Sequence, residues 1–235
     1  MGSASPSYRG HRYSVEVISH CVWLYFRFPL SFREVEELTL ERGVSVSYET
    51  IRRWCMKFGQ QYADLLRRRP RPGDKWHLDE VFIKINGEQK YLWRAVDQDG
   101  MVLDILVHNR RDKAAARRFF RRLLKSAGAV PRVVVTDKLR SYGAVHREVM
   151  PSVEHRSHKL LNNRAENSHQ PTRQRERAMK GFRGTGAAQR FLSAFSGISP
   201  HFRPRRHLMT APGYRAEMTI RFAIWDQVTG RPAAA

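Results

Sequence analysis

The chain has 235 residues, which is enough for one sizeable core and a smaller accessory domain. Its 43 lysines and arginines against 22 acids give a formal charge of +21, which indicates a polyanionic partner. A composition of 41% hydrophobic and 11% aromatic residues excludes a solvated basic tail, because it provides a folded core.

Cys21 and Cys55 lie among apolar residues and form no Cys-x-x-Cys pair. This pattern predicts buried thiols in a reducing compartment, with neither a disulfide framework nor structural zinc. The uncharged stretch 17–26 is too short to cross a bilayer, which takes about 20 residues, and no secretion signal is visible. We therefore expect a cytoplasmic protein with no membrane partner.

The N-terminal region, 1–66, has the pattern of three helices. Apolar residues between 13 and 28 recur at helical spacing, Ser31 and Glu34 form a capping box, and a third helix begins after Ser47. Two helices joined by a glycine-containing turn predict an all-α helix-turn-helix domain. Its third helix would bind DNA through its outward residues Tyr48, Thr50, Arg52, Arg53 and Lys57. The alternative is a helical bundle with a solvated basic face; the total charge favours DNA binding.

A basic, proline-rich linker is predicted at 67–75, and a catalytic domain with C-terminal helices at 76–235. Beyond the linker the pattern changes to period two, with strands at 76–85, 89–96 and 101–107. Asn86-Gly87 predicts a tight hairpin. A helix at 112–128 and a buried strand at 133–136 complete a mixed sheet, so the fold class is α/β. Further elements are expected at 139–149, 153–157, 187–198 and 214–228.

Three acids are candidate ligands for a divalent metal: Asp79, Asp137 and Glu166. Asp79 heads an apolar row in the first strand, and Asp137 follows the buried strand, where open α/β sheets place their chemistry. Carboxylates suit Mg²⁺ or Mn²⁺, and a pair of such ions activates the attacking oxygen in phosphodiester exchange. The alternatives are ion pairing with arginine for the aspartates and a helix-capping role for Glu166.

A basic row follows Glu166. If the helix is continuous, Arg173, Arg177 and Lys180 share the face of Glu166 and would hold DNA backbone, although a solvated face is an equal alternative. Pro171 would either start this helix or kink it. His155 and His158 are interpreted as phosphate or water contacts, and a zinc site is not expected.

Three segments carry a family resemblance: WHLDEVFIKINGEQKYLWRAVDQDG, VVVTDKLRSYG and VEHRSHKLLNNRAENSHQPTRQRERAMKGFR. The chain resembles the DDE transposases of bacterial insertion sequences, in particular the cointegrate-forming insertion-sequence-six family. The resemblance implies a retroviral-integrase-like, RNase H-like core in which Asp79, Asp137 and Glu166 are the catalytic, metal-binding acids. Arg173 matches the basic residue two helical turns after the glutamate.

The implied activity is metal-dependent cleavage that exposes a 3′-hydroxyl at the element's ends, followed by attack of that hydroxyl on target DNA. Double-stranded DNA is the expected partner, and bringing two ends together requires at least a dimer. A DNA-binding regulator or inactive transposase remnant, and a hydrolytic nuclease, remain as alternatives. Covalent catalysis by Ser141 or Tyr142 is disfavoured, because the sequence lacks a cluster that would activate them.

Overall fold

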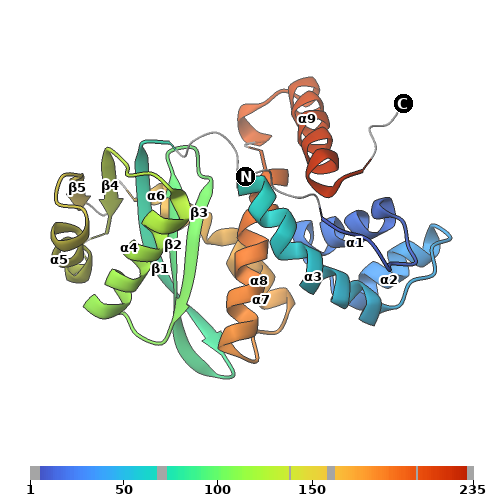
Figure 1. Cartoon of the computed structure of the whole chain (residues 1–235), viewed down its shortest axis with the longest axis horizontal. Helices are drawn as coiled ribbons and strands as arrows, with labels where there is room; N and C mark the ends of the chain where they lie inside the picture. The colour runs from blue at the N-terminus through green and yellow to red at the C-terminus, as the bar shows by residue number, and fades with distance from the viewer. Residues whose placement is uncertain (1–5, 68–72, 138, 158–161, 205, 232–235) are drawn as a thin grey trace. The chain divides into compact units, whose positions relative to one another are not determined.

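A computed structural model describes residues 6–67, 73–137, 139–157, 162–204 and 206–231 (Figure 1). For Arg140, Asn163, Arg164 and Glu166 it describes the backbone but not the side chain. The chain divides into two compact units: a helical unit made of 1–68 and 193–235, and a sheet unit made of 69–192. Among the described residues, no helix combines the length and apolar character needed to cross a membrane.

The helical unit begins with the three helices expected from the sequence: α1 (Val15–Arg27), α2 (Phe32–Glu41) and α3 (Tyr48–Arg67). The predicted capping box opens α2, since the Glu34 amide donates to the Ser31 hydroxyl and the Ser31 amide to the Glu34 carboxylate. Gly43 ends the turn after α2 with a φ of +75°, a backbone conformation that glycine adopts without strain. Ile18, Ile51 and Phe58 form the fully buried centre of these three helices.

The C-terminal elements also belong to the helical unit. The sequence places them in a domain spanning 76–235, but from Ser193 onward they group with the N-terminal helices. The unit includes the end of α8 (Thr185–Ile198), the short helices η2 (Pro200–Phe202) and η3 (Arg206–Leu208), and α9 (Ala211–Thr229). The reason is aromatic packing: the Trp225 ring lies 5.1 Å from Tyr62 and 5.4 Å from Phe202. The Tyr8 hydroxyl donates to the Thr229 carbonyl at 2.6 Å, which connects the segment before α1 to the end of α9.

The sheet unit contains, within the described residues, a mixed sheet of five strands in the order β3-β2-β1-β4-β5. These strands are β1 (Lys75–Ile85), β2 (Glu88–Asp97), β3 (Val102–His108), β4 (Val133–Thr136) and β5 (Glu154–Ser157). β1, β2 and β3 form the predicted antiparallel meander, turned at Asn86-Gly87, whereas β4 pairs parallel with β1 and β5. The expected α/β fold class, preceded by a helical N-terminal region, is confirmed. Residues 68–72 of the expected linker lie outside the described residues.

Helices cover both faces of this sheet (Figure 1). On one face α4 (Lys113–Ala127) and α5 (Arg140–Val149) bury Trp76, Leu78 and Trp93. On the other face α6 (Asn163–Ser168) and the start of α8 cover Ile83 and its neighbours, with α7 (Gln170–Ala178) between them in the chain. Because side chains alternate along β1, Asp79 points to the α6 face and Glu80 to the α4–α5 face.

The α5–β5 side of the sheet holds a stacked histidine pair, His146 and His155, whose ring centroids are 4.7 Å apart. Burial lowers the pKa of both imidazoles below the ordinary value of 6.5. The unfolded chain therefore binds protons more readily than the folded one, so stability is full above about pH 6.5 and falls below it.

We expect the urea midpoint of unfolding to decrease between pH 7.5 and pH 5.5, and His146→Phe to reduce that decrease while keeping an aromatic ring. Denaturation followed by circular dichroism across this range measures the effect. The same change at the exposed His207 is the matched control. An equal pH dependence in His146→Phe and the unmodified protein would contradict the assignment.

Candidate active site

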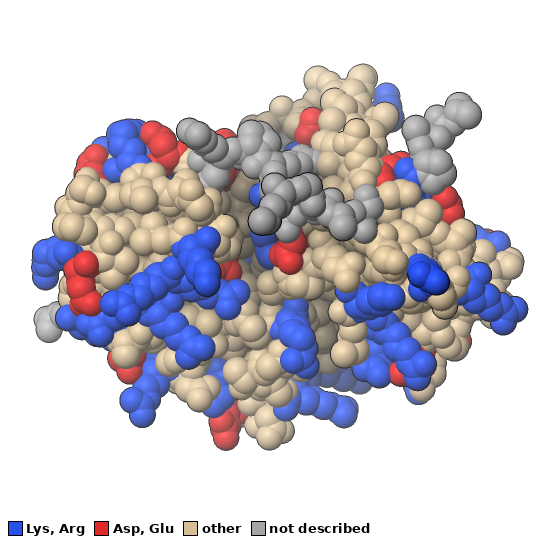
Figure 2. All heavy atoms as spheres, in the orientation of Figure 1, with Lys and Arg blue, Asp and Glu red and all other residues tan. Residues whose placement is uncertain are grey.

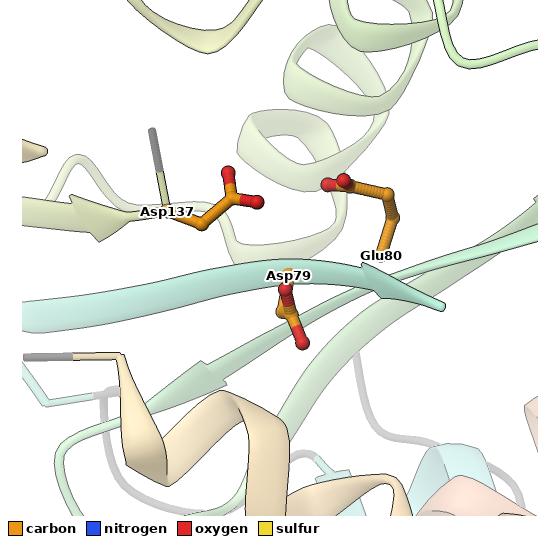
Figure 3. A group of neighbouring side chains, drawn as sticks. All are labelled: Asp79, Glu80 and Asp137. Carbon is orange, nitrogen blue, oxygen red and sulfur yellow. The ribbon is translucent and has the colours of Figure 1, made fainter. Parts of the chain in front are cut away.

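Two of the three acids predicted to hold metal meet in the structure. Asp79 lies in the middle of β1 and Asp137 directly follows β4, the parallel neighbour of β1. Carboxylate oxygens of Asp79, Glu80 and Asp137 all lie within 4.8 Å of one another. Figure 3 shows Asp79 on one side of β1, with Asp137 and Glu80 turned toward each other on the other side.

Glu80 is a member of the cluster that the sequence reasoning missed. Arg111 donates from Nε to its carboxylate at 2.6 Å, and the Tyr142 hydroxyl donates to the second carboxylate oxygen. Burial raises the pKa of Glu80, and these two donors oppose that effect. Glu80 therefore has a structural explanation, since it anchors Arg111 and Tyr142 between the sheet and its covering helices.

Tyr142 is fully buried, and burial holds the pKa of its hydroxyl well above the ordinary value. A buried phenol that already donates to a carboxylate is not placed to attack DNA. The structure thus agrees with the expectation that no tyrosine at this position acts as a covalent nucleophile.

The acidic cluster fits a divalent cation. Its donors are hard carboxylate oxygens, which Mg²⁺ and Mn²⁺ prefer over sulfur or nitrogen. Asp137 is about one-quarter exposed and lies at the strand end, where a bound phosphate has access. Its Oδ1 accepts the Leu139 amide at 3.0 Å, and the Arg111 guanidinium lies 3.5 Å from Oδ2. With Glu80 held by two donors, Asp79 and Asp137 are the residues of the cluster best suited to share an ion.

Glu166 lies on α6, which packs against β1 and β2, but its side chain is outside the described part of the chain. The start of α6 is fixed beside the first aspartate by Asn162. This fully buried residue donates from Nδ2 to the Leu78 carbonyl at 2.8 Å, one position before Asp79. The helix that carries the third acid is therefore tied to the strand that carries the first.

His169 and Arg94 are further residues of this site that the sequence reasoning missed. His169 is 1% exposed, and its Nε2 lies 3.5 Å from Oδ2 of Asp79. Burial lowers the pKa of this imidazole far below its usual range, so it contacts the carboxylate as a neutral ring. His169 lies between α6 and α7, at the N-cap of α7, so helical spacing from Glu166 did not single it out.

Arg94 faces Asp79 across the β1–β2 pair and is also buried. Its guanidinium donates to the Ser168 carbonyl and, at 2.6 Å, to the Thr172 hydroxyl. Arg94 thus fastens the junction between α6 and α7 to the central part of the sheet.

The helix after Glu166 is not continuous, so the expected basic row is only partly formed. α6 ends at Ser168, and Pro171 stands in the first turn of a separate helix, α7, because proline lacks the amide that a helix interior requires. Arg173 and Arg177 are exposed on α7. Lys180 lies beyond the end of α7 with a φ of +55° and does not continue the row.

The first turns of α3 present the residues expected to contact DNA. Tyr48, Arg52, Arg53 and Lys57 are exposed and Thr50 is half-buried. Glu49, which the sequence reasoning did not single out, accepts hydrogen bonds from both arginines, and the Arg52 guanidinium lowers the pKa of this carboxyl to about 2. His158, expected to contact phosphate or water, lies outside the described residues, whereas His155 accepts or donates a 2.9 Å hydrogen bond to the Thr136 hydroxyl.

Sequence comparison shows similarity to transposases. The family model described as "DDE domain" (DDE_Tnp_IS240) matches residues 73–205. The transposase for the insertion sequence-like element IS431mec of Staphylococcus aureus is 35% identical over 172 residues, covering 69% of this chain and 75% of the relative. The transposase for insertion sequence element IS257 in transposon Tn4003, also of Staphylococcus aureus, is 34% identical with the same coverage.

Solved structures with partial similarity include the HTLV-2 integrase catalytic core domain in complex with magnesium, in its trimeric form. It has 13% identity and a TM-score of 0.40, and the match covers 62% of this chain and 95% of that one. The Mos1 transposase catalytic domain with Raltegravir and Mg has 12% identity and a TM-score of 0.36, covering 74% and 93%.

The extent of the sequence matches defines the class of protein. The chain is a DDE-type transposase, an enzyme that transfers polynucleotide strands. It belongs to the insertion-sequence-six family of these transposases, as the three quoted segments indicated.

Proposed function

We propose that this transposase cleaves DNA at the ends of its insertion sequence and joins the exposed 3′-hydroxyl to target DNA, using Asp79, Asp137 and Glu166 as catalytic, metal-binding residues. The observation that carries the proposal is the meeting of Asp79 and Asp137, far apart in the sequence, with oxygens within 4.8 Å. Two Mg²⁺ or Mn²⁺ ions would activate the attacking oxygen and stabilise the leaving one.

In this proposal each residue around the acidic cluster has a defined role. Asp79 and Asp137 bind from the sheet, and Glu166 binds from α6, which Asn162 and Arg94 hold against β1 and β2. The neutral His169 lies against Asp79 and leaves its negative charge available for a cation. Arg111, between Glu80 and Asp137, offers a guanidinium near the position of the scissile phosphate.

DNA binding is proposed for two regions. On α3, Tyr48, Thr50, Arg52, Arg53 and Lys57 would contact the terminal repeats, since a helix that follows a tight turn enters the major groove by its first turns. Arg173 and Arg177 on α7, with Lys180 beyond it, would contact the phosphate backbone near the acids. We further propose that a homodimer or larger assembly brings two ends together, and that the protein acts in the cytoplasm on nucleoid DNA.

The proposal is tested with the purified full chain, a labelled duplex of one element end, and a supercoiled target plasmid. We expect cleavage and joined products with Mg²⁺ or Mn²⁺ and none in EDTA. Cleavage without joined products would indicate a hydrolytic nuclease instead. Specific binding of the end without any metal-dependent cleavage would indicate a DNA-binding regulator.

A further inference from the structure

Helix α4 carries a charge distribution that the acidic cluster does not explain. It has six basic residues and no acid among its fifteen positions: Lys113, Arg117, Arg118, Arg121, Arg122 and Lys125. Its apolar residues, including Phe119, Phe120 and Leu123, are buried against the sheet. The basic side chains therefore gather on the outer side of the helix, and Figure 2 shows lysine and arginine atoms clustered in the region of α4.

Neighbouring acids neutralise only half of this set. Glu148 pairs with Lys113 and Arg117, and Asp104 pairs with Arg122 at 2.8 Å. Within the described ranges, no acidic side chain lies at ion-pair distance from Arg118, Arg121 or Lys125, which are all exposed. We call these three residues the α4 basic face.

The like charges of the α4 basic face destabilise the helix. Arg118 and Arg121 are three residues apart and Arg121 and Lys125 four, so like charges are neighbours on one surface. Repulsion between them is relieved when a polyanion supplies negative charge. α4 is about 22 Å long at 1.5 Å per residue, which corresponds to about six base pairs of duplex.

The position of α4 connects this face with the acids. The helix begins two residues after Arg111, whose guanidinium lies between Glu80 and Asp137. A duplex with a phosphate at Asp137 therefore has flanking backbone within reach of α4. From these observations we propose that the α4 basic face binds the phosphate backbone of double-stranded DNA independently of sequence, alongside the acidic site. That the bound polyanion is DNA rests on the proposed function.

The test uses the full chain in EDTA, so that DNA is bound and not cut, and the triple variant Arg118→Gln, Arg121→Gln, Lys125→Gln. Phosphate contacts are lost equally for any sequence, so affinity should fall by the same factor for a terminal duplex and an unrelated duplex. The slope of log affinity against log salt should become shallower by about 0.9 per lost contact, up to about 2.7. Thermal stability without DNA should be unchanged or higher, because repulsion on α4 is removed.

The matched control removes the same charge from cations that already have acidic partners: Lys90→Gln, Arg132→Gln and Arg156→Gln, paired with Glu88, Asp74 and Glu154. It should leave the salt slope nearly unchanged. The proposal is overturned if the α4 variant binds both duplexes with unchanged affinity and an unchanged salt slope. It is also overturned if the control variant loses as much affinity and salt dependence as the α4 variant. Absence of DNA binding in the unmodified protein would instead overturn the proposed function together with this inference.

Discussion

Asp79→Asn and Asp137→Asn are each expected to reduce strand cleavage and strand transfer about a thousandfold or more. An amide keeps the shape of the carboxylate but removes the negative charge that binds a divalent cation. Metal catalysis lowers the barrier by several kcal/mol, and each 1.4 kcal/mol is a factor of ten in rate. Rates on a labelled terminal duplex, with Mg²⁺ and separately with Mn²⁺, measure the loss.

Measuring DNA binding by the two variants distinguishes a loss of catalysis from a loss of folding. Both variants should bind the terminal duplex nearly as well as the unmodified protein, because they keep all the basic side chains. Mn²⁺ should raise the melting temperature of the unmodified protein by binding its folded state, and both variants should lose this increase. Asp104→Asn is the matched control: this buried aspartate pairs with Arg122 outside the cluster, and the variant should still cleave. Full activity in Asp79→Asn or Asp137→Asn would refute the metal assignment.

Trp93→Ala is expected to lower the free energy of unfolding of the sheet unit by about 3–5 kcal/mol, the cost of deleting a large buried aromatic side chain. Trp93 lies on the interior strand β2, between β3 and β1, and is fully buried. Its ring centroid is 6.1 Å from Phe119 on α4 and 5.6 Å from Tyr142 on α5, so the residue joins both covering helices to the sheet.

Urea denaturation of the full chain, followed by circular dichroism, measures this loss. Phe82→Ala is the matched control, because Phe82 is on the neighbouring strand but 56% exposed, and its removal should cost less than about 1 kcal/mol. Equal losses in the two variants would mean that Trp93 is not part of the core that positions α4 and α5. Since Tyr142 also contacts Glu80, cleavage by Trp93→Ala should be weakened even where the protein is still folded.

Local patterns were sufficient to predict most of the elements. The alternation in β1 and the Asn86-Gly87 turn specify a hairpin, and the structure pairs Ile85 with Glu88 across that turn. The capping box at Ser31 fixes the start of α2 in the same way. Asp137 was recognisable because an acid after a short buried strand lies at the edge where parallel strands end.

Other features depend on contacts that one sequence does not reveal. Glu80 and Asp79 are adjacent, and only the three-dimensional partners Arg111 and Tyr142 distinguish the structural acid from its neighbour. His169 lies in the interruption between α6 and α7, whose position depends on Pro171 and on the long-range anchor Arg94. The grouping of α9 with the N-terminal helices rests on contacts such as that between Tyr62 and Trp225, far apart in the chain.

The division of the helical unit between the two ends of the chain has a consequence during synthesis. As the ribosome makes the protein, the segment for the sheet unit emerges whole and can fold while α1, α2 and α3 still lack Trp225, the partner of Tyr62 on α9. Helix α9 emerges last of the elements. A nascent chain stopped before Trp225 would therefore have a formed catalytic core and an incomplete helical unit, so the acids would be assembled before the N-terminal helices reach their final packing.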